Sequence, residues 1–356
     1  MMPLLRKRSR VTVAVDIGSN VVKCLRIDHS GEAPMITHFA MVDLLPEAIV
    51  EGEIMDRDMV VEAIRECFAR SGIQETQVMS AVGGRSVIVK KILTDKMTTA
   101  DAKEAILWEA EQHVPFDIDD ISLDFQIVKD DVGANQMEIL LVAAKKETIS
   151  EHAALLRDAG LTPVLVDVDA FAVQNCFEVA EGGPQEQVVG LLNVGADVTS
   201  VCIVENGVPY FTRDLAVGTN RFVEEFQRRF NLGDEDARRV VADPDTQDEI
   251  SADDIAAVVA DVAEDLGTGI ERSLSFLRTS GDAESIDRIV LTGGGGRFPG
   301  LADYLREHHE IEVEEGDPLA GIDYDPEIFT DYDTDRISPL LAVSIGLGLR
   351  TVGDKS

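Results

Sequence analysis

The sequence predicts an α/β fold of two similar lobes, and three observations support that prediction. A first unit places two apolar, strand-like runs, 11–17 and 21–27, around a polar turn, and continues with an extended segment and a helix. An imperfect copy of the same order begins near residue 188. A third stretch, from residue 288, is a buried-type strand that runs into four glycines. A repeated unit of this size indicates two lobes that face one ligand.

The polar turn of the first unit has the chemistry of a phosphate site. Gly18, Ser19 and Asn20 form the turn, with Asp16 before it and Lys23 after it. Such a turn aims backbone N–H groups at an anion, and the serine and lysine side chains add donors. The Asp16 carboxylate can hold a hydrated divalent cation beside the phosphate. For this turn taken alone, an ordinary β-hairpin is the alternative.

The first unit continues with an extended segment at 34–42 and a helix at 56–71, whose apolar spacing indicates core packing. After a strand at 77–82, Gly83 and Gly84 precede a compact unit, from Arg85 to about Thr162, in the order strand, helix, strand, strand, helix. We predict that this unit is inserted between parts of the first lobe. Its elements are 86–92, 99–113, 121–128, 137–144 and 149–159.

A strand at 164–168 and a helix that opens at Asp169 return the chain to the first lobe. Asp167 and Asp169 fit the role of caps at the helix N-terminus, and this interpretation stands beside the functional one given for Asp169 below. The linker 181–187 then leads into the second lobe.

The second lobe repeats the meander and adds helices. A Gly195–Asp197 turn separates its first two strands, and Asn206-Gly207 is a hairpin signal before the third. The predicted strands are 188–193, 198–204 and 208–217, followed by a helix at 219–230. An acidic helical insertion spans 221–267, with its clearest helices at 234–241 and 252–266, and a separate helix follows at 267–278.

Near the end of the chain, Gly293, Gly294, Gly295 and Gly296 follow a strand and precede a helix. Glycines let a backbone approach a flat or anionic ligand closely, although a plain strand-to-helix loop is the alternative. We predict an irregular loop over 316–338 and a final helix over 339–349, because the former lacks periodicity and the latter is rich in Ala, Gly and Leu.

Composition excludes several classes of function. The chain has 356 residues, 45% of them hydrophobic, and a net charge of −35, which argues against nucleic-acid binding. Four cysteines without CxxC spacing indicate buried free thiols in a reducing compartment. No run reaches the length of a membrane span, and residues 1–10 form a basic, disordered tail. His113 ends a helix and shows no ligand spacing, so we predict no metal site made of protein ligands.

The three turns together carry a resemblance. The Asp16–Lys23 spacing, the second turn from Asn193 to Asp197 and the Gly293–Gly296 turn resemble the phosphate-1, phosphate-2 and adenosine motifs of the actin/hexokinase/DnaK superfamily. Within it the chain resembles the PilM family of type IV pilus assembly proteins, which is similar to the division protein FtsA. The most specific matches are SVIVKKI (86–92), EAEQHVPF (109–116) and AVSIGLGLR (342–350).

This resemblance implies a two-lobed, actin-like fold, a duplicated ribonuclease-H-like architecture, with an inserted FtsA/PilM-type subdomain called 1C. It assigns the chain after residue 10 to four subdomains. Subdomain 1A comprises 11–84, 163–186 and 338–352, subdomain 1C comprises 85–162, subdomain 2A comprises 187–220 and 268–337, and subdomain 2B comprises 221–267.

The resemblance also implies an ATP and Mg²⁺ site between the lobes. Its catalytic candidates are Asp16, which would hold Mg²⁺ through water, Asp169, which would position the attacking water, and Asn193. Superfamily members commonly have Asp where this chain has Asn193, so we expect at most slow hydrolysis. The alternative is that Asp197 supplies the missing carboxylate. The nucleotide-binding candidates are Gly18, Ser19, Asn20, Lys23, Gly195, Ala196, Asp197, Thr199, Glu271, Gly293, Gly294, Gly295 and Gly296.

By the same resemblance the chain is a cytoplasmic scaffold, peripheral to the inner membrane, in the type IV pilus alignment complex. Its expected partner is the cytoplasmic N-terminal tail of PilN, with other pilus machinery proteins and a homo-oligomer as further partners, and with membrane contact only through partners. An FtsA-like division protein and a small-molecule kinase remain alternatives. FtsA ends in an amphipathic membrane helix, which residues 351–356 do not resemble.

Overall fold

The computed structural model describes residues 10–184, 186–242, 250–280 and 285–350. The predicted basic tail, apart from its last residue, and the predicted end of subdomain 1A at 351–352 lie outside the described residues. Within the described part of the chain, no helix is long and apolar enough to cross a membrane.

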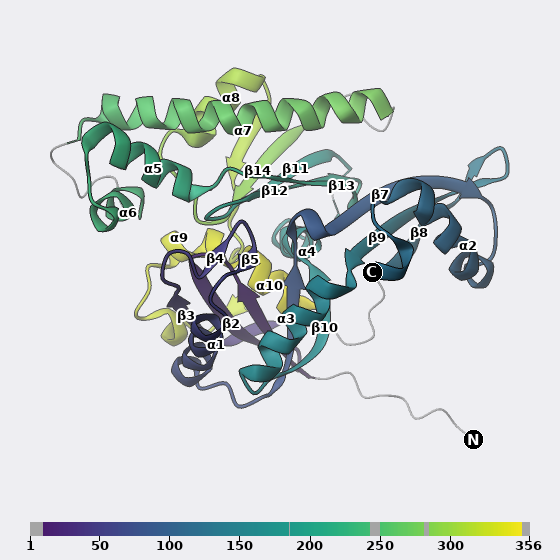
Figure 1. Cartoon of the computed structure of the whole chain (residues 1–356), viewed down its shortest axis with the longest axis horizontal. Coiled ribbons are helices and arrows are strands. Elements are labelled where there is room, and N and C mark those ends of the chain that lie inside the picture. The colour runs from purple at the N-terminus through teal and green to yellow at the C-terminus, as the bar shows by residue number, and fades with distance from the viewer. Residues whose placement is uncertain (1–9, 185, 243–249, 281–284, 351–356) are drawn as a thin grey trace.

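The first lobe is built on a six-stranded sheet in the order β10-β6-β1-β2-β3-β16 (Figure 1). Strands β1, β2 and β3 form an antiparallel meander, whereas β6 and β10 join it in parallel. The strands are β1 (Val11–Ile17), β2 (Val21–Asp28), β3 (Met35–Asp43), β6 (Gln77–Val82), β10 (Thr162–Val168) and β16 (Asp323–Tyr324), and a small hairpin pairs β4 (Ile49–Val50) with β5 (Glu53–Ile54).

The second lobe repeats this topology in the order β15-β14-β11-β12-β13. The repeat extends to the turns, because Gly18 N–H donates to Val21 O at 3.1 Å and Gly195 N–H donates to Val198 O at 3.0 Å. The predicted duplication is therefore confirmed. The strands are β11 (Val188–Val194), β12 (Thr199–Glu205), β13 (Val208–Leu215), β14 (Arg288–Thr292) and β15 (Glu312–Glu315).

The second sheet does not end at β13. Phe211 of β13 pairs antiparallel with Lys90 of β7, and the inserted strands β7, β9 and β8 extend the sheet to eight strands. In the sequence, the predicted insertion lies between two strands of the first lobe, β6 and β10. In space, it shares a sheet with the second lobe (Figure 1). Its elements are β7 (Val87–Asp95), α2 (Thr99–His113), β8 (Ile121–Gly133) and β9 (Gln136–Lys145). The helix that we predicted as its last element, 149–159, corresponds to α3 (Lys146–Asp158), which packs on the first lobe instead.

Helices form three layers around the two sheets. Helices α4 and α10 lie between the sheets, in a core shared by both lobes. Helices α1 and α3 cover the outer face of the first sheet, and α5 to α8 cover the outer face of the second (Figure 1). Their bounds are α1 (Arg57–Ser71), α3 (Lys146–Asp158), α4 (Asp169–Ala180), α5 (Thr219–Phe230), α6 (Asp234–Ala242), α7 (Ala252–Ser280), α8 (Leu301–His309) and α10 (Ala342–Leu349).

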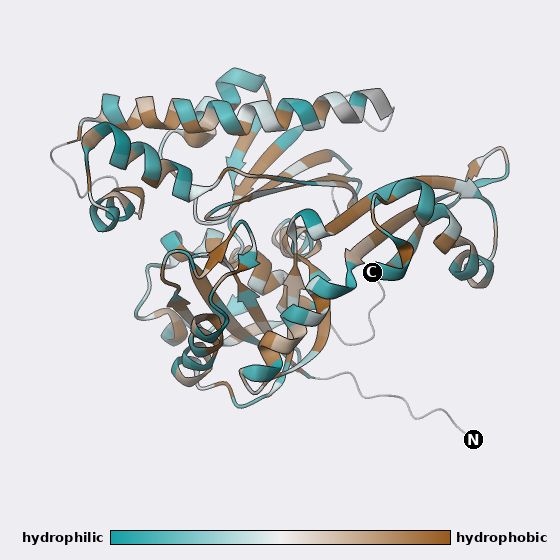
Figure 2. Ribbon diagram, in the orientation of Figure 1, coloured by the Kyte–Doolittle hydropathy of each residue, from teal (hydrophilic) through white to brown (hydrophobic). Residues whose placement is uncertain are grey.

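Local sequence signals explain where these elements begin and end. The Asp56 side chain caps α1 by accepting from Met59 N–H, and Gly72 ends the helix at φ +71°. The hairpin at Asn206 and Gly207 has positive φ at both residues, as its sequence predicts. Hydrophobic residues concentrate in the strands and on the helix faces that meet them (Figure 2).

The prediction of two helices on either side of residue 267 was wrong. A single helix, α7, runs from Ala252 to Ser280. Its glycines serve packing instead of ending a helix: a Cβ at Gly267 would lie 2.8 Å from His309 Nε2, and one at Gly269 would lie 2.6 Å from Leu215 Cδ1. Close neighbours therefore explain two glycines that a sequence pattern takes for helix breakers.

The prediction of an irregular loop over 316–338 was also wrong in part. Strand β16 pairs parallel with β3, and a 3₁₀ turn (Pro326–Phe329) and the short helix α9 (Thr334–Ile337) follow it. Phe329 anchors the segment, with its ring centroid 5.2 Å from that of Phe39. The final helix begins later than predicted, because a 3₁₀ turn occupies Ser338–Leu341.

Candidate functional site

The two predicted phosphate turns occupy equivalent positions in their lobes. Asp16 pairs with Lys23 across β1 and β2, and Asn193 pairs with Ser200 across β11 and β12. Asn193 is therefore the second-lobe counterpart of Asp16. Among the described residues no group accepts a hydrogen bond from the backbone N–H groups at the turn tips, 19–20 and 196–197. Free N–H groups at a tight turn are suited to an anion.

Asp16 and Lys23 form a buried ion pair at the base of the first turn. Lys23 Nζ lies 2.9 Å from Asp16 Oδ2, and the two residues are 7% and 8% exposed. Ser344 of α10 donates from Oγ to the same carboxylate oxygen at 3.2 Å. Sequence reasoning missed Ser344, because only the packing of α10 against β1 brings it there.

Asp169 opens α4 and lies close to this pair. Desolvation by burial raises the pKa of its carboxyl to about 7, the negative charges of Asp16 and Asp214 add to the rise, and Lys23 opposes it. The carboxylate packs on Gly83, where a Cβ would lie 2.5 Å from Oδ2. A carboxyl group that titrates near neutrality suits a proton acceptor.

Asp214, near the end of β13, is a site residue that sequence reasoning missed. Its carboxylate accepts hydrogen bonds from the Ser200 hydroxyl and from the backbone N–H of Gly84, and burial raises its pKa. It therefore links the second lobe to the point where the insertion leaves the first. An acid between Arg213 and Leu215, next to the end of a strand, was the only sequence signal.

Direct contacts join the two turns across the lobes. Asn20 Nδ2 donates to Asn220 Oδ1 at 3.2 Å, and Asn220 Nδ2 donates to Asp197 Oδ1 at 2.6 Å. The second oxygen of Asp197 accepts from the backbone N–H of Glu51 at 3.2 Å. Asn220 of α5 therefore bridges Asn20 and Asp197. Both carboxylate oxygens of Asp197 accept hydrogen bonds from the protein itself.

The glycine turn after β14 packs on the second phosphate turn. Gly293 has φ +80°, and a Cβ there would lie 2.4 Å from Val194 O. A Cβ at Gly295 would lie 2.4 Å from Val194 Cγ1, and one at Gly296 would lie 2.7 Å from Thr292 O. Internal packing thus requires three of these glycines. Gly294 is the exposed one and is free to face a ligand.

The remaining candidates lie in two different environments. Thr199 is fully buried and its hydroxyl donates to Val217 O at 2.7 Å. Asn193 Oδ1 accepts from Thr292 Oγ1 at 3.4 Å, next to the glycine turn. Glu271 does not lie at the glycine turn. Its side chain is 66% exposed, and it lies 4.0 Å from His309, which is at the end of α8 opposite to the glycine turn.

Metal and thiol predictions can be compared with the described residues. No group of three or more His, Cys, Asp or Glu among them is arranged to hold a metal ion. Cys24, Cys67, Cys176 and Cys202 are all buried and free, as predicted. His113 ends α2 as predicted, and burial and Lys90 lower its pKa.

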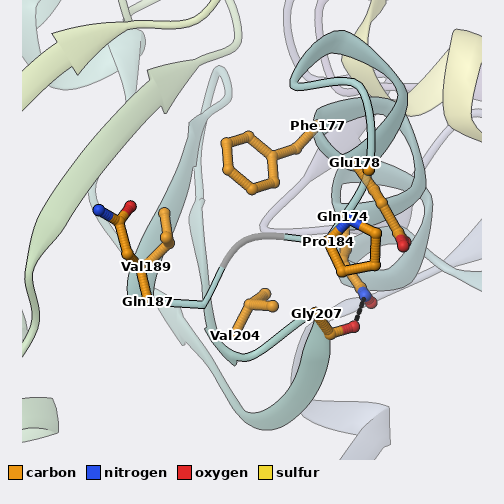
Figure 3. Close-up of a pocket in the computed structure, with 9 residues that line it drawn as sticks. Gln174, Phe177, Glu178, Pro184, Gln187, Val189, Val204 and Gly207 are labelled. Atoms are coloured by element: carbon orange, nitrogen blue, oxygen red, sulfur yellow. Dashed lines mark hydrogen bonds between the residues drawn. The ribbon is translucent and has the colours of Figure 1, made fainter.

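A small pocket lies away from these turns, at the opposite end of the β11–β12 hairpin (Figure 3). Phe177, Val189 and Val204 give it an apolar lining, and Gln174 Nε2 donates to Gly207 O at 2.7 Å beside it. It marks the packing of α4 against the second lobe. It has no part in the phosphate turns.

Comparisons with solved structures identify the fold. The ethanolamine utilization protein EutJ from Carboxydothermus hydrogenoformans is 14% identical, with a TM-score of 0.52, over 95% of this chain and 89% of that one. MreB 5 of Spiroplasma citri bound to AMPPNP is 12% identical, with a TM-score of 0.53, over 95% of each chain. The duplicated lobes and these matches define an actin-like fold, as predicted.

The family follows from two further matches. The chain of a solved PilM-PilN type IV pilus biogenesis complex is 28% identical, with a TM-score of 0.82, and the match covers 96% of this chain and 99% of that chain. The family model of the type IV pilus assembly protein PilM matches residues 14–352. This chain belongs to the PilM family, so the predicted membership is confirmed.

Proposed function

We propose that this chain is a cytoplasmic, actin-like, ATP-binding scaffold of the type IV pilus alignment complex, held at the inner membrane through the N-terminal tail of PilN. The observation that carries the proposal is the match to the PilM–PilN complex along nearly the whole of both chains. Family membership over residues 14–352 supports it independently. Other pilus machinery proteins and further copies of the chain would assemble on the same scaffold.

The test of this scaffold role is capture of a synthetic PilN N-terminal segment. Immobilised tail should retain the full chain, and a tail with the same composition in shuffled order should not. The capture is run with and without ATP and Mg²⁺, so that nucleotide-dependent binding is separated from constitutive binding. Absence of capture in both conditions would refute the scaffold proposal while leaving nucleotide binding to be judged by calorimetry.

We place the tail near the junction of the first lobe and the insertion. The motifs at 86–92 and 109–116 match the family closely and lie outside the phosphate turns. In the structure, Ile88 and Phe116 are partly buried around the core of the insertion. Phe116→Ala should weaken capture of the tail, whereas Val132→Ala, an exposed apolar truncation in β8, should not. Equal capture by both variants would contradict this placement.

ATP would lie between the lobes, with its phosphates at the two polar turns and adenosine against the glycine turn after β14. The support is geometric: backbone N–H groups at 19–20 and 196–197 lack acceptors among the described residues, and Gly294 is exposed. Glu271 lies apart from the glycine turn, so we leave it out of this site. Mg²⁺ would be held by water near Asp16, where it would offset phosphate charge.

Lys23 gives this nucleotide proposal its sharpest test. Lys23→Ala removes a charge-assisted contact worth roughly 1.5–3 kcal/mol, so ATP affinity should fall about 10- to 100-fold. The same change leaves the Asp16 carboxylate buried without its cation, which costs stability. Circular dichroism should therefore establish that the Lys23→Ala variant is folded before its ATP affinity is measured by calorimetry. Lys23→Arg, which keeps the charge, is the matched control. No ATP binding to the folded wild type would refute the proposal.

We also propose that ATP hydrolysis is slow and that occupancy is the functional signal. Asp169 would accept the proton of the attacking water. Asn193 lacks the charge of a carboxylate, and both oxygens of Asp197 are bonded to protein, so Asp197 does not replace it. Magnesium and the developing phosphate charge are then held less firmly. A wild-type turnover of about 1 s⁻¹ or faster would contradict this view.

A further inference from the structure

The outer face of α2 carries two large apolar side chains in contact with solvent. Trp108, the single tryptophan of the chain, is 71% exposed, and Leu107 beside it is 47% exposed. The inner face of the same helix is complete, because Ala102, Ile106 and Ala110 are buried in the core of the insertion. An amphipathic helix needs only that inner stripe in order to fold. An exposed apolar pair on the other side indicates a contact surface.

Carboxylates border this apolar pair. Glu104 precedes Leu107 by three residues, and Glu111 follows Trp108 by three, so all four share one side of the helix. Both glutamates are exposed, and neither has an ion-pair partner among the described residues. Lys103 lies at the flank of this side. We call Glu104, Leu107, Trp108 and Glu111 the α2 outer face.

The charge of this face selects its partner. Two copies that met through the same face would place unpaired glutamates against each other, and an anionic lipid leaflet would repel them. The net charge of −35 further disfavours acidic partners. An arginine meets both features of the face, since its guanidinium pairs with carboxylates and stacks on an indole ring.

We propose that the α2 outer face binds a basic amphipathic helix of another protein, which stacks an arginine on Trp108 and pairs its cations with Glu104 and Glu111. Glu104 and Glu111 are seven positions apart, about two helical turns, so a partner helix can carry matching cations seven residues apart. This contact is additional to the PilN tail that we place at the junction with the first lobe.

The single tryptophan provides a direct readout. The probe is a synthetic helical peptide with arginines seven residues apart around two leucines, and its control has the same composition in shuffled order. Titration into the full chain should shift tryptophan emission to shorter wavelength, because the indole leaves water. The shuffled peptide should bind at least about tenfold more weakly. Absence of a saturable shift would overturn the proposal.

Variants separate this surface from general charge attraction, with anisotropy of the labelled peptide as the signal. Trp108→Ala and the double variant Glu104→Lys/Glu111→Lys should each weaken binding at least about tenfold, the range of an interface hot spot. Glu147→Lys/Glu151→Lys changes the net charge equally on exposed positions of α3 and should have little effect.

Three outcomes would refute the proposal. Equal weakening by both double variants would mean that only net charge acts. A concentration-dependent blue shift without peptide would assign the face to a second copy, and binding to anionic vesicles would assign it to a membrane. Capture of the PilN tail by each variant is scored separately, so failure of the scaffold role and failure of this surface are distinguishable.

Discussion

Gly346 is where one methyl group should matter most. Helices α4 and α10 cross there so closely that a Cβ on Gly346 would lie 1.7 Å from Ala172 O, a backbone atom of α4. Real Cβ contacts begin near 3.0 Å, so Gly346→Ala forces the two helices more than 1 Å apart. Gly348→Ala, one half-turn later, meets Ile27 Cδ1 at 2.6 Å, the movable end of a side chain.

The two substitutions share the same intrinsic helix gain of about 1 kcal/mol, so their difference reports packing alone. Overpacking a side-chain end costs about 1–3 kcal/mol, which leaves Gly348→Ala within about 2 kcal/mol of wild type. Separating two backbones inside the shared core should cost Gly346→Ala about 4 kcal/mol or more. Chemical unfolding followed by circular dichroism measures both. A Gly346→Ala protein as stable as the Gly348→Ala protein would refute the packing argument.

Two further predictions concern the Asp169 carboxylate at the start of α4, and a third concerns the amide of Asn193. The pKa of Asp169 is about 7, above its unfolded value, so the folded state binds this proton more tightly and wild-type stability should fall as pH rises from about 4 to 7. Asp169→Asn removes the effect, so unfolding measured at pH 5 and pH 8 should show the variant gaining on wild type at the higher pH; a constant difference would contradict the shift. Gly83→Ala should displace this carboxylate, whose Oδ2 lies 2.5 Å from the new Cβ, and lower single-turnover hydrolysis with ATP affinity retained; unchanged turnover would count against Asp169 as the base. Asn193→Asp should raise single-turnover hydrolysis and leave affinity for the PilN tail within about twofold, and no rise would mean that the amide is not what limits turnover.

Local patterns predicted the parts of the fold that local forces determine. Continuous apolar runs and the turn glycines set the two meanders, and the register of Asp16 with Lys23 follows from hairpin geometry. Their similarity to a known family then identified the lobes. The continuous helix α7 was missed because Gly267 and Gly269 resemble helix ends until His309 and Leu215 are seen against them.

The site was harder to predict, because its polar contacts join distant segments. Ser344 reaches Asp16 across 328 residues of sequence, and Asp214 reaches Gly84 through the pairing of two subdomains. Neither residue belongs to a short motif. Glu271 shows the opposite error. It matched a motif on the long helix α7, but it lies beside His309 and not at the glycine turn that it was expected to join.

The pairing of β13 with β7 couples the insertion to the second lobe. Backbone pairing attaches the insertion to the second sheet, while two chain connections join it to the first lobe, one through Gly83 and Gly84 and one where β9 runs directly into α3. A change in the angle between the lobes would then bend these two connections, because the insertion moves with the second sheet. A partner bound at these connections would sense the angle between the lobes without touching the nucleotide.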